Sequence, residues 1–233
     1  MRTPTKLLFT ALLLSSVMVA CKSEKETETP EAQATQTESI ADAKTEESTE
    51  AAPSAVLNAN LATEDDLKGI GLSDDMIAQI TAQRPFLTMN DFAALVGDDA
   101  NKVELYKKIF VPFNLNTTAK DDFKMIPGVG DKMAHEFDEY RPYTSVAQFE
   151  REIGKYVDED QVAYYLNFVF VPVELNSASE ADIKALPGVG NKMAHEFEEY
   201  RPYQNMEQFR REIGKYVDDK ELARLERFVY LNE

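Results

Sequence analysis

The residues of this chain that are best suited to bind a ligand stand in two copies of a Pro-Gly-Val-Gly turn, each followed closely by a lysine. They are Gly128, Val129, Gly130 and Lys132 in one copy and Gly188, Val189, Gly190 and Lys192 in the other. Glycine adopts left-handed backbone angles and lets another molecule approach the main chain closely. Amides that follow such a turn and open a helix favour an anion, because they are unpaired and the helix dipole is positive there. The pattern therefore predicts two sites for a phosphate group.

The turns belong to two nearly identical stretches, Pro127–Tyr143 and Pro187–Tyr203. After the second turn, Met193, Phe197 and Tyr200 recur at helical spacing, which predicts a helix with one apolar face.

The chain around the second turn supplies the signals that begin and end these helices. Ser177 and Glu180 have the spacing of a capping box, which predicts that a short first helix opens at Ser177. Pro202 ends the second helix, because a proline inside a helix removes a donor and clashes with the preceding turn. The predicted unit is a helix, a tight hairpin and a second helix.

This unit resembles the helix-hairpin-helix family, and in particular its ComEA-like DNA receptors. The residues that carry the resemblance are Asn114, Asn116, Ile126–Lys132 and Arg141, and again Asn176, Leu186–Lys192 and Arg201. The resemblance implies weak, sequence-independent binding of double-stranded DNA, with the hairpin amides and Lys132 and Lys192 on backbone phosphate. It also implies a monovalent cation held by hairpin carbonyls, and no other cofactor.

Three tandem repeats follow from the register of recurring Asn and Arg residues, and the resemblance makes them an all-α array. The expected repeats are 56–113, 114–173 and 174–233. Repeat one has Ile70-Gly-Leu-Ser73 in place of the Pro-Gly-Val-Gly turn, and Asp75 in place of the lysine. Its hairpin is therefore predicted to be a poorer anion site. A strand within Phe168–Val173 is an open alternative that needs a partner.

The first 55 residues have the features of an export signal and a tether. Residues 1–20 have a basic start and an apolar run of secretory length, and Met18–Cys21 resembles a lipobox. Cys21, the only cysteine, is the expected lipid anchor, although an ordinary signal peptide remains the alternative. Residues 21–55 are polar and acidic, which predicts a disordered tether. We expect an envelope protein anchored in the outer membrane and facing the periplasm, with surface exposure left open.

The charge of the chain opposes its most obvious function. The formal net charge is −17, and acidic residues outnumber basic ones in each repeat. A basic footprint is the usual mark of a DNA-binding protein. Glu196, Glu198 and Glu199 are expected on the outer face of the hairpin's second helix. Two hypotheses therefore stand: weak DNA binding through repeats two and three, and an envelope scaffold that docks a protein partner.

The remaining residue groups indicate neither catalysis nor a metal site. No nucleophile stands with a base and no carboxylate pair has a catalytic frame, so no enzyme activity is expected. His135 and His195 each lie near glutamates, but nothing completes a metal site, so solvated His–Glu pairs are expected. Two tyrosine pairs could stack on bases or pack at the edge of the core: Tyr140/Tyr143 and Tyr200/Tyr203.

Overall fold

The computed structural model describes residues 56–97 and 101–232, which belong to one compact unit, Glu50–Glu233. The expected signal peptide, the cysteine anchor and the expected tether lie outside the described residues.

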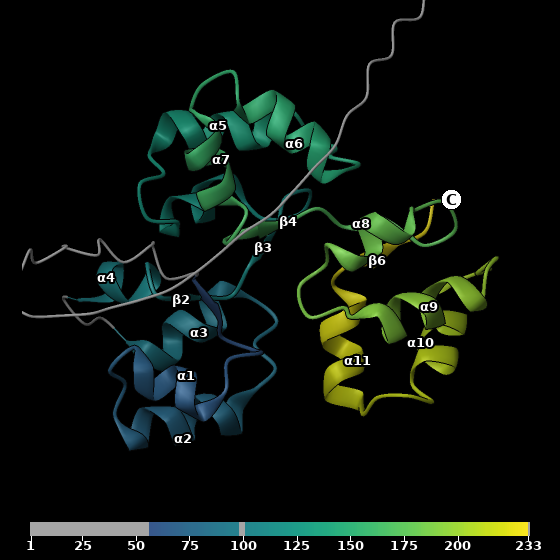
Figure 1. Cartoon of the computed structure of the whole chain (residues 1–233), viewed down its shortest axis with the longest axis horizontal. Helices are drawn as coiled ribbons and strands as arrows, with labels where there is room; N and C mark the ends of the chain where they lie inside the picture. Colours follow the sequence, from purple (N-terminus) through teal and green to yellow (C-terminus); the bar gives the residue numbers. More distant parts are fainter. Residues whose placement is uncertain (1–55, 98–100, 233) are drawn as a thin grey trace, which may run out of the picture. The chain divides into compact units, whose positions relative to one another are not determined.

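Three short parallel sheets divide the described chain into three successive segments. β1 (Leu57–Asn58) pairs with β2 (Ile109–Phe110), β3 (Phe113–Asn114) with β4 (Val169–Phe170), and β5 (Val173–Glu174) with β6 (Val229–Tyr230). We call residues 57–110, 113–170 and 173–230 the first, second and third segments, because each begins and ends on one strand pair. β3 and β4 are seen side by side in Figure 1. The strand that the sequence left open within Phe168–Val173 is therefore present as β4. Its partner, β3, comes from the other end of the same segment.

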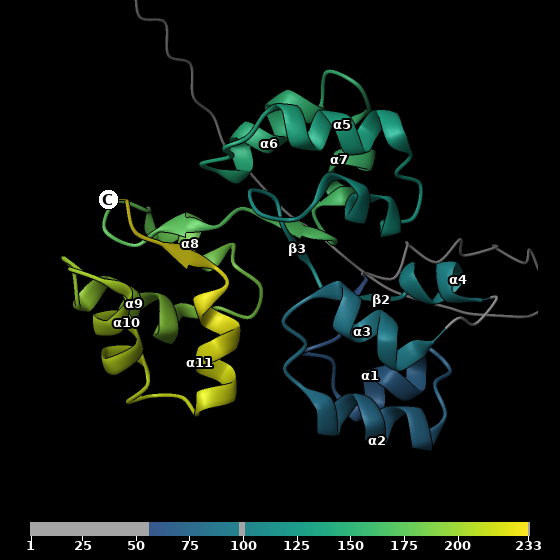
Figure 2. The same cartoon turned by 180° about the vertical axis from the view of Figure 1, so that it is seen from behind.

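The rest of each segment is helical, which confirms the expected all-α fold. The first segment contains α1 (Glu64–Gly69), α2 (Asp74–Gln83), α3 (Met89–Val96) and α4 (Lys102–Tyr106). The second contains the 3-10 helix η1 (Lys120–Met125), α5 (Asp131–Glu139), α6 (Val146–Ile153) and α7 (Glu159–Tyr165). The third contains α8 (Glu180–Lys184), α9 (Asn191–Glu199), α10 (Met206–Ile213) and α11 (Asp219–Glu226). Figure 2 shows α9, α10 and α11 gathered together within the third segment.

Side chains cap most of these helices. Eight helices begin at a residue whose side chain accepts a hydrogen bond from an amide of the first turn: Thr63, Ser73, Thr88, Ser145, Asp158, Ser179, Asn205 and Asp218. The expected cap at Ser177 is wrong by two residues. Ser179 accepts from the Asp182 amide at 3.1 Å, whereas the Ser177 hydroxyl donates to Glu174 at 2.6 Å. The Glu174 carboxylate holds Ser177 in the turn after β5, so the helix starts later.

Phenylalanine rings fill the cores in edge-to-face pairs. Phe137 stands 5.4 Å from both Phe123 and Phe149, and all three are fully buried. In the third segment, Phe197 of the predicted apolar stripe lies 5.2 Å from Phe209. The buried apolar residues of the first two segments form one cluster, and those of the third segment, joined by Phe170 of β4, form another. This packing fixes the helices that carry the glycine turns.

The recurring Asn and Arg residues act as clamps within each segment. In the second segment, Asn116 both donates to the Tyr143 carbonyl and accepts from the Tyr143 amide, each at 2.8 Å. Arg141 donates to the carbonyls of Leu115 and Thr118, and burial lowers the pKa of its guanidinium. The side chain of Asn116 thus makes with Tyr143 the two hydrogen bonds that a neighbouring strand residue would make. These bonds connect the start of the segment to the residues that follow α5.

The same clamp recurs in the other two segments. Asn60 makes the two bonds to Phe86, at 2.9 and 2.7 Å, and Asn176 makes them to Tyr203, at 2.9 and 2.7 Å. Arg201 donates to the Leu175 carbonyl at 2.5 Å. The register that the sequence shows is therefore the register of a structural clamp.

Arg227 joins the three segments. Its guanidinium donates to the carbonyls of Pro112 at 3.1 Å and Phe86 at 3.4 Å, and it lies over the rings of Phe170 and Phe228. No salt-bridge partner faces it among the described residues, and burial lowers its pKa to about 10. A half-buried cation held by carbonyls and ring faces connects the third segment to the other two.

Candidate functional site

The two glycines of each Pro-Gly-Val-Gly turn have different conformations. Gly128 and Gly188 have φ of +86° and +73°, a left-handed region that favours glycine. Gly130 and Gly190 instead have φ of −100° and −83° with extended ψ, and they are the N-caps of α5 and α9. The backbone therefore requires glycine at the first position only, and the second glycine needs another explanation.

The space around the second glycine is open. A Cβ atom built at Gly130 or at Gly190 would meet nothing within 4 Å. Neither backbone angle nor packing within the described chain requires glycine there. A missing side chain at these positions leaves the main chain open to a ligand.

The valines between the glycines belong to the core, which corrects part of the predicted site. Val129 and Val189 are buried, and their amides donate to the carbonyls of Ile126 at 3.0 Å and Leu186 at 3.1 Å. These two amides close the turns and are not free for a ligand. The amides that remain are those at the start of α5 and α9.

The helices α5 and α9 start without a side-chain cap. Their first helical bonds run from Ala134 to Gly130 and from Ala194 to Gly190, both at 3.0 Å. The amides of the first turn, at 131–133 and 191–193, therefore have no helical acceptor. Each turn offers a cluster of donors at the positive end of a helix dipole, which suits an anion.

The first segment shows the same turn with the donor cluster closed. Gly71 has φ of +88°, as Gly128 and Gly188 do. Ser73 stands where the second glycine would be, and its hydroxyl accepts from the Met76 amide at 3.3 Å. Two acidic residues, Asp74 and Asp75, occupy the first turn of α2. An anion would meet a capped and negatively charged helix end, which agrees with the poorer site predicted for this repeat.

Lys132 and Lys192 are exposed, and neither forms an ion pair with a residue that the structure describes. Lys124, by contrast, is engaged by Asp121 at 2.9 Å and Asp131 at 3.1 Å, and its bonds to them raise its pKa. Lys132 and Lys192 are therefore the cations next to the turns that remain available to a ligand, whereas Lys124 neutralises Asp131.

The acidic face expected on α9 is smaller than the sequence indicated. Glu196 is buried at 7% exposure, so its placement on the outer face is wrong. Glu198 pairs with Arg201 at 3.3 Å, and Glu199 lies 3.7 Å from His195. One oxygen of the Glu196 carboxylate is buried without a hydrogen-bond partner in the described chain. Fewer bare carboxylates therefore surround the turn than the net charge implies.

The tyrosine pairs pack as structural residues. Tyr143 and Tyr203 are buried, and burial raises the pKa of both phenols. The Tyr140 hydroxyl meets the Tyr156 hydroxyl at 2.7 Å, and Lys155 lies over the Tyr140 ring. Base stacking by these rings would require them to leave their partners, so the core-edge alternative is the better description.

The histidines form the exposed pairs that were expected. His135 lies 3.2 Å from Glu139 on the surface of α5, and His195 pairs with Glu199 on α9 in the same way. Among residues 56–97 and 101–232, no group of three or more His, Cys, Asp or Glu side chains could hold a metal ion.

The hairpin carbonyls differ between the two turns. Arg224 donates to the Pro187 carbonyl at 2.6 Å and is itself held by Glu221. A guanidinium therefore already occupies one carbonyl that the implied monovalent cation would use. The counterpart of Arg224 in the second segment is Tyr164. The residues present thus fit such a cation better at Pro127 than at Pro187.

Comparison with known proteins agrees with the geometry of the third segment. A family model for the helix-hairpin-helix motif matches residues 169–230, a span from β4 to β6. This part of the chain carries a helix-hairpin-helix domain, and such motifs commonly bind nucleic acid. Among curated proteins and among solved structures, none matches the chain.

Sequence reasoning missed the roles of Asn116, Arg141 and Arg224. The constant spacing of the Asn and Arg residues signalled a structural role, but their bonds to the main chain of Tyr143 and Leu115 depend on how the segment folds back. Within the described ranges, no helix is long and apolar enough to cross a membrane.

Proposed function

We propose that this protein binds double-stranded DNA weakly and without sequence preference, through the turns at Gly130 and Gly190. Under this proposal the three segments are ComEA-like helix-hairpin-helix repeats, and the second and third repeats carry the DNA-binding sites. The first-turn amides of α5 and α9 contact backbone phosphate, and Lys132 and Lys192 supply charge. The protein has no enzyme activity.

One observation carries the proposal: α5 and α9 begin on uncapped glycines, while the matching helix of the first segment is capped by Ser73. A glycine N-cap is no better for helix stability than serine. The open donor clusters therefore have no structural advantage, and a phosphate ligand explains them.

The proposal is tested by fluorescence anisotropy with a short DNA duplex, at low and at physiological salt. We expect binding that weakens linearly with the logarithm of salt concentration, because phosphate contacts release counterions. Replacing both hairpin lysines, Lys132→Glu with Lys192→Glu, should abolish it. A matched control is Lys155→Glu with Lys215→Glu, which makes the same charge change at the opposite ends of α5 and α9, where these lysines lie over Tyr140 and Tyr200. An equal loss of DNA affinity in both double variants, or no loss in either, would contradict the proposed site.

A second candidate function is an envelope scaffold that docks a protein partner, and the net charge of −17 favours it. It predicts no salt-dependent affinity for DNA even at low ionic strength, and a partner that is captured by crosslinking.

We also propose export and lipid anchoring, because Met18–Cys21 has the form of a lipobox. The proposed location is the outer membrane, with the protein facing the periplasm. Its proposed role there is in DNA uptake. Mass spectrometry of the purified protein should find a chain that begins at an acylated Cys21. An unmodified cysteine, or cleavage elsewhere, would contradict the anchor.

A further inference from the structure

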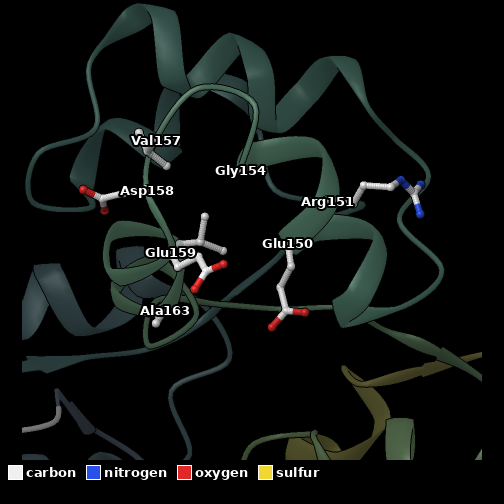
Figure 3. Close-up of a pocket in the computed structure, with 8 residues that line it drawn as sticks. Glu150, Arg151, Gly154, Val157, Asp158, Glu159 and Ala163 are labelled. Atoms are coloured by element: carbon white, nitrogen blue, oxygen red, sulfur yellow. The ribbon is translucent and has the colours of Figure 1, made fainter.

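A pocket of about 680 Å³ lies between α6 and α7 of the second segment, on the opposite half of the segment from the glycine turn. Gly154, Val157, Val162 and Ala163 give it an apolar floor, and Glu150 and Glu159 stand at its rim. Figure 3 shows the carboxylates of Glu150 and Glu159 directed to the same side, while Arg151 points away from them. Arg151 is bonded to Glu152 instead, at 2.9 Å.

The pocket exists because three residues differ from their counterparts in the third segment. There, Arg210 of α10 forms a bidentate ion pair with Glu226 of α11, with Nε–oxygen distances of 3.0 and 3.1 Å. The second segment has Glu150 and Leu166 at these two positions, which cannot form the bridge. The groove between its two helices is left uncrossed.

The floor of the groove is also less filled in the second segment than in the third. In the third segment, the Leu222 side chain would lie 3.4 Å from a Cβ atom at Gly214. Its counterpart, Val162, is one methylene shorter, and at Gly154 a Cβ would meet only backbone atoms of Glu150. The same groove is therefore open in the second segment, because it lacks both the ion pair that crosses the groove in the third segment and the leucine that fills it.

We propose that this groove docks a basic, aliphatic segment of a protein partner. Both rim carboxylates lack an ion-pair partner in the described chain, so a cation that binds beside them gains a favourable charge interaction. Lysine and arginine combine a charged head with an aliphatic stem that covers apolar surface. The volume suits more than one side chain, as ligand pockets of about 300–1,000 Å³ do.

Nucleic acid does not fit this groove, because its phosphates would face the rim carboxylates of Glu150 and Glu159. The proposal therefore does not depend on DNA binding at Gly130 and Gly190. A chain that binds DNA through its turns would still hold a basic partner here.

The test uses the full chain and three fluorescent 12-residue peptides, in 150 mM salt so that distant charges are screened. One peptide has lysine and leucine at helical spacing, the second is oligolysine, and the third carries glutamate in place of each lysine. We expect the first to bind at least tenfold more tightly than oligolysine, and the third not to bind. Equal affinity for the first two would overturn the proposal, because general charge attraction would then suffice.

Two variants locate the binding. Ala163→Trp fills the groove without changing charge, and it should weaken binding of the lysine–leucine peptide at least tenfold. Ala78→Trp, at an exposed position of α2 in the first segment, should leave it unchanged. The double change Glu150→Gln with Glu159→Gln should have a similar effect, and Asp65→Asn with Asp75→Asn removes the same charge elsewhere. Wild-type affinity in either groove variant would overturn the proposal, and circular dichroism checks that both fold.

A second copy of this chain is the competing occupant. Its third segment carries basic residues on α10 and α11, including Arg211 and Lys220. Sedimentation velocity should find the wild-type chain monomeric with the groove free. A dimer that Ala163→Trp dissociates would assign the groove to self-association and reject the external partner. DNA affinity should be unchanged by Ala163→Trp, which separates this result from the fate of the proposed function.

Discussion

At the scale of single residues, a glycine is informative when neither its backbone angles nor its packing demand it. Gly128 has a positive φ, so an alanine there would cost about 1–2 kcal/mol by steric strain. Gly130 has an ordinary φ and open space around it. The first glycine builds the turn, and the second keeps the amides of α5 uncovered. Because the two glycines have different roles, a substitution at the second one tests the ligand site without disturbing the turn.

Changing the second glycines to serine should raise stability and lower DNA affinity together. In Gly130→Ser with Gly190→Ser, each hydroxyl would cap its helix as Ser73 does, stabilising it by a few tenths of a kcal/mol. The same hydroxyls would occupy the donors that phosphate needs. Thermal unfolding and duplex anisotropy measure the two effects. Affinity that stays at the wild-type value would show that the amides contact no phosphate.

At the scale of elements, the same framework carries an open helix end in two segments and a closed one in the first. The turn, the positive φ and the Asn–Arg clamp are common to all three segments. What differs is the residue at the N-cap and the charge in the first turn of the helix. These positions can therefore be exchanged between segments without rebuilding the fold.

The first segment should gain DNA affinity when its helix end is opened. Ser73→Gly with Asp75→Lys gives α2 the N-cap and the lysine of α5, at a cost of a few tenths of a kcal/mol for the lost cap. Duplex anisotropy at low salt should show tighter binding and a steeper salt dependence. The control Asp65→Lys adds the same charge away from the helix end and keeps the Ser73 cap. Equal gains in both variants would point to bulk charge.

The Asn clamp should be a stability element without a direct role in binding. Asn116→Ala leaves the amide and the carbonyl of Tyr143 unpaired, and we expect a loss of about 2–4 kcal/mol, since each buried orphan costs about 1–3 kcal/mol. Urea unfolding measures it. Asn90→Ala, at an exposed position of α3, should change stability by less than about 0.5 kcal/mol. A small loss at Asn116 would mean that water replaces the clamp.

At the scale of the whole molecule, Arg227 is where the segments meet. Its guanidinium binds carbonyls from the first segment and from the linker between the first two segments, and it has no carboxylate partner in the described chain. The side chain of Leu61, from the first segment, also lies against Gly188 of the third. Contacts of this kind couple the segments, so they should unfold together.

Removing Arg227 should weaken that coupling. Arg227→Met keeps a flexible apolar side chain but leaves the Pro112 carbonyl without its donor, and we expect a loss of about 2–3 kcal/mol. Arg211→Met, which breaks an exposed pair with Glu212, should cost less than about 1 kcal/mol. Urea unfolding followed by tyrosine fluorescence would show one transition in the wild type and a broader one in Arg227→Met. Identical curves would show that the segments are independent.

The sequence by itself determined the helical fold, the register and the positions of the two glycine turns. These follow from local chemistry: apolar spacing, glycine and proline punctuation, and near-identical copies. It also singled out Gly130 and Lys132 as places where a ligand could reach the main chain. It could not assign roles within the turn, because whether Val129 offers its amide depends on a bond to Ile126.

Only the tertiary structure decided which polar residues are buried and which ends of a segment meet. The strand pairs join residues 52 or 56 positions apart, and no local pattern reveals a partner at that distance. Glu196 left the acidic face because the folding of α9 against its neighbours turned it inward. The groove between α6 and α7 likewise depends on a bridge that Arg210 and Glu226 make in the third segment but Glu150 and Leu166 cannot. Side chains separated in sequence meet only when packing brings them together, so such contacts are properties of the fold.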